Sequence, residues 1–161
     1  MIRNMRSSDA DFVLDIYRRG LDTGEASFET SPPDWPAWQL KYHSFCRLVW
    51  EQDGEVRGWA ALAPVSAREC YRGVAEVSIY VDTRHLGQGI GGRLMAALVE
   101  ESEQHGIWTL YSSIFPENLA TLRLHLGHGF RKVGIRERIA RRDGRWRDTL
   151  LLERRSTRVG V

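Results

Sequence analysis

The chain contains only two cysteines, Cys46 and Cys70, among its 161 residues. They show neither the spacing of a structural zinc site nor the cysteine density of a disulfide-stabilised secreted domain. The sequence also lacks any run of about 18 apolar residues that would span a membrane, and residues 1–6 lack the apolar segment of a signal peptide. We therefore expect a cytoplasmic protein without a membrane partner.

A strong excess of charge is also absent, because 23 lysines and arginines face 21 aspartates and glutamates, for a formal net charge of +2. So nearly balanced a charge argues against a nucleic-acid partner. The local exception is the arginine-rich stretch of residues 131–158, in which arginines alternate with apolar or acidic residues. A solvated sheet face is the simpler interpretation of this stretch, and an anionic ligand is the alternative.

With 161 residues, 42% of them hydrophobic, the chain has the length of one well-packed domain, to which we assign residues 1–161. Apolar patterns follow one another in the order β-α-α-β-β-β-α-β-α-β-β. Gly20 is expected to end the first helix, and Asp53-Gly54 and Asp143-Gly144 to form tight hairpin turns. The predicted fold class is α/β (α+β), with a mixed, mostly antiparallel sheet of about six or seven strands flanked by about four helices.

A glycine-rich loop, residues 86–92, follows a strand pattern and precedes an amphipathic helix. Exposed N–H groups at such a helix N-terminus favour phosphate binding, although a ligand-free turn is the simpler alternative. The loop satisfies G-x-G-x-x-G, but residues 93–161 close with a hairpin and leave no room for the second half of a dinucleotide-binding domain. A nucleotide triphosphate loop is excluded because Arg93-Leu94 stands where Lys-Ser or Lys-Thr is needed.

The loop Leu86-Gly87-Gln88-Gly89-Ile90-Gly91 resembles the Arg/Gln-x-x-Gly-x-Gly/Ala pyrophosphate loop of the GCN5-related N-acetyltransferases. Leu86 departs from this pattern, because the family usually has Arg or Gln there. The resemblance implies the fold of that superfamily and acetyl-CoA as co-substrate, with no metal. It implies that the co-substrate contacts a strand segment, the loop and one helix start, namely Ile79, Tyr80, Val81, Gly87, Gln88, Gly89, Ile90, Gly91, Gly92 and Asn118.

Within that superfamily the chain resembles the phosphinothricin acetyltransferase group over nearly its full length. The matching segments are Ile16-Tyr17, residues 26–30 with Pro33, residues 68–81, Asn118 with Leu124-His125 and Gly129-Phe130, and residues 144–148. This resemblance implies acetyl transfer, in a ternary complex, to the amino group of a small amino-acid-like acceptor such as phosphinothricin, methionine sulfoximine or methionine sulfone. It also implies a homodimer and a role in resistance or detoxification.

Two residues are candidates for proton transfer. On an alternating strand, Glu76 shares one face with Ser78 and Tyr80, and a carboxylate in such apolar surroundings is either half of an ion pair or a general base. The matched position in the resembling group is its proposed general base. His125 stands where the superfamily has a proton-donating tyrosine, and a histidine satisfied within the fold is the alternative. His128 would allow a metal pair with His125, but no third ligand is in view.

The resemblance places Arg68 and Asn118 near the acceptor, and we add Phe28, Tyr71 and Ser78 as acceptor-binding candidates. A planar guanidinium can hold a carboxylate or phosphinate at two points. Glu29 and Trp35 are further candidates for the pocket wall. Two alternatives remain: an enzyme of the same fold acting on a peptide N-terminus or polyamine, and a binding module for acyl-CoA that performs no transfer.

Overall fold

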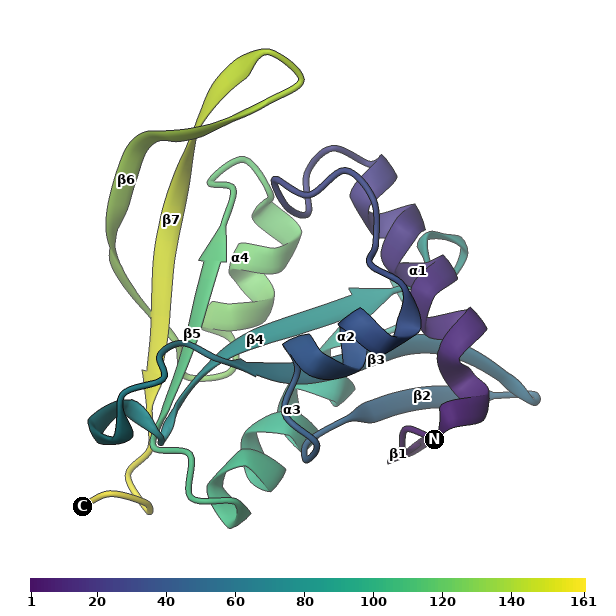
Figure 1. Cartoon of the computed structure of the whole chain (residues 1–161), viewed down its shortest axis with the longest axis horizontal. Helices are drawn as coiled ribbons and strands as arrows, with labels where there is room; N and C mark the ends of the chain where they lie inside the picture. Colours follow the sequence, from purple (N-terminus) through teal and green to yellow (C-terminus); the bar gives the residue numbers. More distant parts are fainter.

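The computed structural model describes all of residues 1–161, and its strands form one open sheet with the order β1-β2-β3-β4-β5-β7-β6 (Figure 1). The strands are β1 (Ile2–Asn4), β2 (Leu48–Gln52), β3 (Glu55–Pro64), β4 (Val74–Val81), β5 (Thr109–Ile114), β6 (Arg131–Arg142) and β7 (Arg145–Arg155). Only β4 and β5 pair in parallel, and every other pair is antiparallel. The predicted mixed sheet and the predicted order of elements are confirmed.

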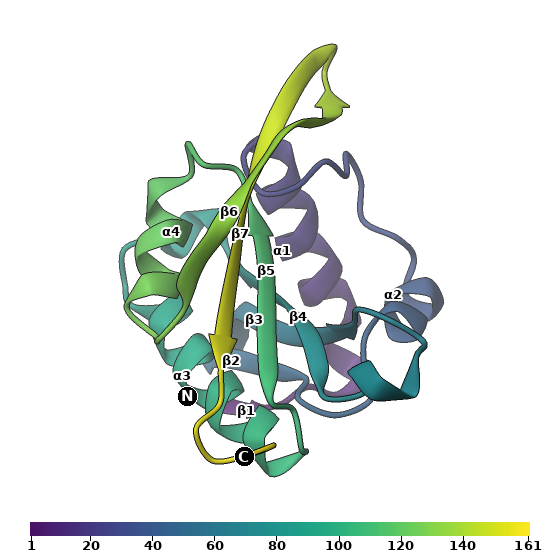
Figure 2. The ribbon, with the colours of Figure 1, turned by 90° about the vertical axis from the view of Figure 1, so that its left-hand side faces the viewer.

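Helices cover both faces of this sheet. They are α1 (Ala10–Asp22), α2 (Trp35–Lys41), α3 (Ile90–Gln104) and α4 (Leu119–Leu126). Figure 2 shows α1 and α2 on one side of the sheet and α3 and α4 on the other. Each side has its own apolar core, one centred on α3 and the other on α1, α2 and an aromatic cluster around Trp59. None of the helices has the length and apolarity needed to cross a bilayer.

Both Asp-Gly pairs form the tight turns that the sequence predicts. Asp53 and Gly54 have φ angles of 55° and 78°, and Asp143 and Gly144 have 50° and 76°. Two successive residues with positive φ define the turn that matches the natural twist of a two-stranded hairpin. The second turn joins β6 to β7 in a long hairpin that extends beyond the rest of the sheet (Figure 1).

The parallel pair of β4 and β5 is short, and it gives the molecule its opening. Only Val74, Ala75 and Glu76 of β4 are in register with β5, opposite Thr109, Leu110 and Tyr111. Beyond Glu76 the two strands diverge (Figure 1). The second half of β4 therefore has β3 on one side and no strand on the other, so its main-chain groups on that side are free to bind a ligand.

The expectation that Gly20 ends the first helix is wrong, because α1 continues to Asp22. Gly20 has a different role: a Cβ at this position would lie 2.6 Å from Cδ1 of Tyr80. The ring of Tyr80 packs between α1 and the sheet, stacked on Tyr17 at 4.7 Å and on Trp59 at 5.1 Å between ring centroids. Glycine in the helix thus allows β4 and α1 to approach each other closely.

We predict that Gly20→Ala destabilises the fold, although alanine is the better helix former. Overpacking typically costs ~1–3 kcal/mol and helix propensity returns up to ~1 kcal/mol, so the free energy of unfolding should fall by about 1 kcal/mol in urea titrations. Gly134→Ala is the matched control, because its added Cβ meets no atom within 4 Å. A Gly20→Ala variant as stable as the control would contradict this prediction, because it would show that the Tyr80 ring moves aside without a cost in stability.

Candidate active site

A cavity of about 320 Å³ lies where β4 and β5 diverge. Its walls come from the second half of β4, the end of β5, the start of α4, the loop between α1 and α2, and Lys41 at the end of α2. Small-molecule sites typically have volumes of roughly 300–1,000 Å³, so the cavity suits a small ligand. Nine of the predicted site residues line it: Phe28, Glu29, Glu76, Ser78, Ile79, Tyr80, Val81, Asn118 and His125.

The side chains of β4 alternate between the two faces of the sheet, as the sequence predicts. Val77, Ile79 and Val81 pack against the core on the α3 side. Tyr80 packs on the α1 side, and Ser78 accompanies it there, 3.1 Å from the hydroxyl of Tyr42. Glu76 is placed on this second face by the same alternation.

Glu76 occupies the point at which the sheet opens. It is the last residue of β4 in register with β5, and its half-buried side chain lines the cavity. Burial raises the pKa of the Glu76 carboxyl, Lys41 opposes this effect and Glu29 adds to it. Neither Arg68 nor Arg72 forms an ion pair with Glu76, so the ion-pair interpretation is not supported. A carboxyl group of raised pKa beside an open cavity is a better proton acceptor than an ordinary carboxylate.

Opposite β4, three polar side chains form a cluster in the cavity wall. The hydroxyl of Tyr17 donates to Oε2 of Glu29 at 2.5 Å, and Nζ of Lys41 lies 3.2 Å from Oε1 of Glu29 and 3.1 Å from the Tyr17 oxygen. Burial would lower the pKa of Lys41, but the neighbouring Tyr42 and Glu29 raise it overall, so Lys41 stays charged. Lys41 is the only lysine or arginine in the cavity lining.

The glycine-rich loop forms the N-terminus of α3. Gly87 and Gly89 each have a φ of 77°, in the left-handed region that favours glycine, and Gly89 caps the helix without a side-chain hydrogen bond to its first N–H groups. A Cβ on Gly91 would lie 3.6 Å from Val81 and 3.7 Å from Leu124, so the loop adjoins the end of β4 and α4. The exposed Leu86 lies just outside this helix start. The loop can therefore receive phosphate groups of a ligand that follows β4.

His125 is 5% exposed, and both of its ring nitrogens have partners. Nδ1 lies 2.7 Å from the Thr121 carbonyl oxygen, which only accepts, so we assign the proton to Nδ1. Nε2 lies 2.7 Å from Oγ of Ser112 and accepts its hydroxyl hydrogen. Burial lowers the pKa of His125, the hydrogen bond to Thr121 opposes this, and His128 adds to the lowering. This geometry matches a histidine satisfied within the fold, and proton donation by His125 stays a prediction.

Asn118 and Phe28 line the cavity but also hold its walls together. Asn118 caps α4, since its Oδ1 accepts from the Thr121 N–H at 3.2 Å, and its Nδ2 donates to the Glu25 carbonyl at 3.2 Å. The Phe28 ring meets that of Phe115 edge-on, with centroids 5.0 Å apart. Both residues therefore connect the loop after α1 to the segment between β5 and α4.

Arg68, Tyr71 and Trp35 do not line this cavity. Arg68 and Tyr71 lie in the exposed connection between β3 and β4, with the Arg68 guanidinium carbon 5.4 Å from the centroid of the Tyr71 ring. Trp35 begins α2 and stacks on Trp38. The predicted contacts of Arg68 and Tyr71 with an acceptor stay predictions.

The sequence did not reveal the parts played by Tyr17, Lys41 and Ser112. The solvated interpretation of the arginine-rich stretch is also wrong at two positions, because the side chains of Arg142 and Arg147 are only 7% and 13% exposed. Both bind the loop after α1 instead. No motif marks such pairings, since they join segments more than 110 residues apart.

Comparison with known proteins assigns this architecture to a family. The profile of the Acetyltransferase (GNAT) family matches residues 11–130, and the chain belongs to this family. Phosphinothricin N-acetyltransferase of Alcaligenes faecalis is 32% identical over 160 residues, which cover 95% of this chain and 81% of that protein. The predicted relationship to the phosphinothricin acetyltransferase group is thereby confirmed.

Two solved structures extend the comparison. A phosphinothricin acetyltransferase of the GNAT superfamily from Sinorhizobium meliloti, in complex with acetyl-CoA, has a TM-score of 0.89 and 26% identity, covering 99% of this chain and 90% of that one. A ribosomal-protein-alanine N-acetyltransferase from Brucella melitensis has a TM-score of 0.90 and 28% identity, covering 97% and 99%. The chain is thus an N-acetyltransferase, and acetyl-CoA is its co-substrate.

The state of His125 can be tested directly. Nitrogen-15 NMR of the imidazole should show the neutral ring with the proton on Nδ1 at pH 7, and protonation only below the ordinary histidine value of about 6.5. Because the folded-state pKa is depressed, the contribution of His125 to stability is complete above about 6.5 and is lost as the pH falls. An imidazolium at pH 7 would contradict this assignment and favour proton donation.

Proposed function

We propose that this N-acetyltransferase transfers the acetyl group of acetyl-CoA to the amino group of a small amino-acid-like acceptor, by direct transfer in a ternary complex. The observation that carries the proposal is the position of Glu76, at the base of the opening between β4 and β5 and facing the cavity. A module that only bound acyl-CoA would have no use for a carboxyl of raised pKa at this point.

The proposed reaction needs a base because an amino-acid amine with a pKa near 8 is roughly nine-tenths protonated at pH 7. Acetyl-CoA supplies an electrophilic thioester carbon, to which the amine nitrogen bonds as the carbon–sulfur bond breaks. In this proposal Glu76 accepts the proton that the amine must lose, directly or through one water molecule. The raised pKa of Glu76 brings its basicity closer to that of the amine.

Two features of the chain support the proposed place of the co-substrate. The main-chain groups of Ile79 to Val81 have no strand on the β5 side, so they can pair with amide groups as an added strand would. The glycine-rich loop at the start of α3 adjoins Val81, and its N–H groups favour pyrophosphate. Asn118, which we expected to contact the pantetheine arm, lies across the opening at the start of α4.

The proposed acceptor side is the wall formed by the loop after α1 and by Lys41. The cavity volume suits a small molecule rather than a long peptide, and the charge of Lys41 suits the acidic group of an amino acid analogue. The name of the Alcaligenes faecalis relative, a phosphinothricin N-acetyltransferase, agrees with an acceptor of this kind. The Brucella melitensis structure, named for acetylation of a ribosomal protein, keeps a peptide N-terminus as the alternative.

The expectation of a homodimer also stays a proposal. Three apolar side chains of the edge strand β6, Val133, Ile135 and Ile139, are about half exposed, as is Trp146 just after the hairpin turn. A second copy of the chain covering β6 would remove these side chains from water. The proposed cytoplasmic location has a separate basis, because the two cysteines form no disulfide pattern and so fit a reducing compartment.

Glu76→Gln should lower kcat by a factor of about 10²–10⁴ and leave the KM for acetyl-CoA nearly unchanged, as expected for loss of a general base. In the wild type, kcat/KM should fall as the pH drops through the raised pKa of Glu76. Glu100→Gln is the matched control, because Glu100 is exposed on α3. Wild-type turnover in the Glu76 variant would exclude the proposed role.

The same substitution should raise the thermal stability of the protein. Because the folded-state pKa of Glu76 lies above its unfolded value of about 4.3, its stabilising effect is complete below that value and is lost as the pH rises through the folded-state pKa. The ionised group is therefore a cost at pH 7 that glutamine removes. Calorimetry at pH 7 and pH 4 should show a gain in Tm that is larger at pH 7.

An acceptor panel tests the proposed substrate class. Thiol release from acetyl-CoA should be fastest with phosphinothricin, methionine sulfoximine or methionine sulfone, and slow with polyamines and peptides. Lys41→Met should raise the KM for these acidic acceptors several-fold, without a matching change for acetyl-CoA. A preference for spermidine or for a peptide N-terminus would replace the proposed acceptor and leave the activity of the family intact.

A further inference from the structure

The acceptor loop, residues 23–34 between α1 and α2, has no helix or strand of its own, yet five of its residues in succession, Glu25 to Glu29, line the cavity. A loop of this kind must find partners for its main-chain carbonyl groups outside itself. Within the loop, the hydroxyl oxygens of Thr23 and Ser27 accept from the N–H groups of Glu25 and Glu29, which leaves the carbonyl groups to other partners. The long-range partners come from the other end of the chain.

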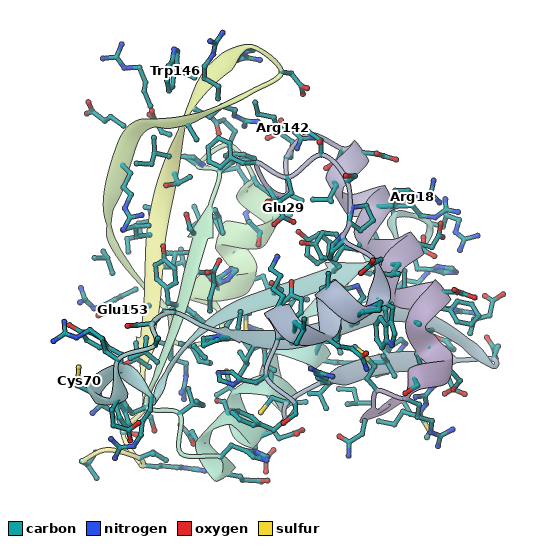
Figure 3. All side chains as sticks on the ribbon, in the orientation of Figure 1. Arg18, Glu29, Cys70, Arg142, Trp146 and Glu153 are labelled. Atoms are coloured by element: carbon teal, nitrogen blue, oxygen red, sulfur yellow. The ribbon has the colours of Figure 1, made fainter.

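Arg142, the last residue of β6, is the main partner. Its Nη1 donates to the carbonyl of Ser27 at 2.8 Å and to that of Glu29, and its Nη2 donates to the carbonyl of Leu21 at 2.8 Å. Figure 3 shows the side chain of Arg142 between the hairpin and the loop that carries Glu29. The nearest carboxylate, that of Asp143, is 3.6 Å away and 75% exposed. The charge of this buried guanidinium is therefore stabilised mainly by the dipoles of the carbonyl groups.

Two further side chains hold the first part of the loop. Nη1 of Arg147 donates to the Gly24 carbonyl at 3.0 Å, while its Nη2 pairs with Glu25 at 3.0 Å and with Glu117 at 3.2 Å. The Arg147 guanidinium also lies 3.8 Å from the centroid of the Phe115 ring. The side chain of Asn118 donates from Nδ2 to the carbonyl oxygen of Glu25. The β6–β7 hairpin and the start of α4 thus bind four carbonyl groups of the loop between residues 24 and 29.

The bond from Arg142 to Glu29 reaches the cavity directly. The carbonyl of Glu29 accepts from Arg142, and the carboxylate of the same residue accepts from Tyr17 and Lys41 inside the cavity wall. Arg142 itself is absent from the cavity lining. We propose that Arg142 is a positioning residue that holds the acceptor loop in its binding shape, and so sets affinity and selectivity for the acceptor without touching it.

The inference rests on the proposed acceptor side of the cavity, and it is tested first in a way that needs no acceptor. Hydrogen–deuterium exchange of the full chain should show faster exchange of residues 23–34 in Arg142→Gln than in the wild type, with the exchange of α3 unchanged. Arg145→Gln is the matched control, because Arg145 pairs with Arg142 across the hairpin and is exposed. It should exchange as the wild type does.

Kinetics give the second readout. In Arg142→Gln the KM for the acceptor should rise about tenfold or more, with the KM for acetyl-CoA within about twofold of wild type, because the loop must be ordered on binding. Arg142→Lys keeps the charge but not the planar guanidinium with its two donor nitrogens, so its KM for the acceptor should lie between those of the wild type and Arg142→Gln. A general loss of folding would instead change both KM values and kcat together.

Unchanged exchange of residues 23–34 in Arg142→Gln would overturn the proposal whatever the acceptor is. Faster exchange with an unchanged acceptor KM would overturn the link between the loop and affinity. If Arg142→Gln does not fold, Arg142→Lys and Arg147→Gln replace it in the comparison. Residues 23–34 should then exchange faster than in the wild type in both variants, and wild-type exchange in Arg142→Lys would overturn the proposal. Absence of turnover with every acceptor in the wild type would count against the proposed function alone.

Discussion

The divergence of β4 from β5 after three residue pairs is the constraint on which the rest of the structure depends. A sheet that stayed paired would satisfy its main chain internally and leave no room for a ligand. Because the strands part at Glu76, one feature creates both the cavity and a free strand edge, and it places a carboxyl at the point where they meet. The flanking helices then supply the walls.

The opening imposes an electrostatic cost that the structure meets in two ways. Glu76 and Glu29 face the same cavity, and Lys41 offsets the charge of both. It lowers the pKa of Glu76, and it forms an ion pair with Glu29. The buried phenol of Tyr17 stays protonated, since burial raises its pKa, and so remains a donor to Glu29. The cluster leaves Glu76 as the carboxyl without a fixed partner, and therefore as the one available to exchange a proton.

Local sequence was sufficient for features set by local physics. The alternation of Glu76, Ser78 and Tyr80, the positive φ angles of the glycine-rich loop and both Asp-Gly turns follow from strand pleat and from backbone freedom. The order of elements followed from hydrophobic period. Gly20, Lys41 and Arg142 could not be interpreted this way, because their roles depend on Tyr80, Glu29 and Ser27, which reach them only through the tertiary fold.

The long separation in sequence between Arg142 and the loop it binds has a consequence for folding. The carbonyl of Leu21 and the guanidinium of Arg142 are 121 residues apart, so this contact is among those with the highest entropic cost of closure. The apolar core on the α1 side draws all its buried residues from residues 13–63, so it can form before the hairpin docks. The loop of residues 23–34 should therefore be the last part of the molecule to become rigid, and the first to lose its order when the hairpin frays.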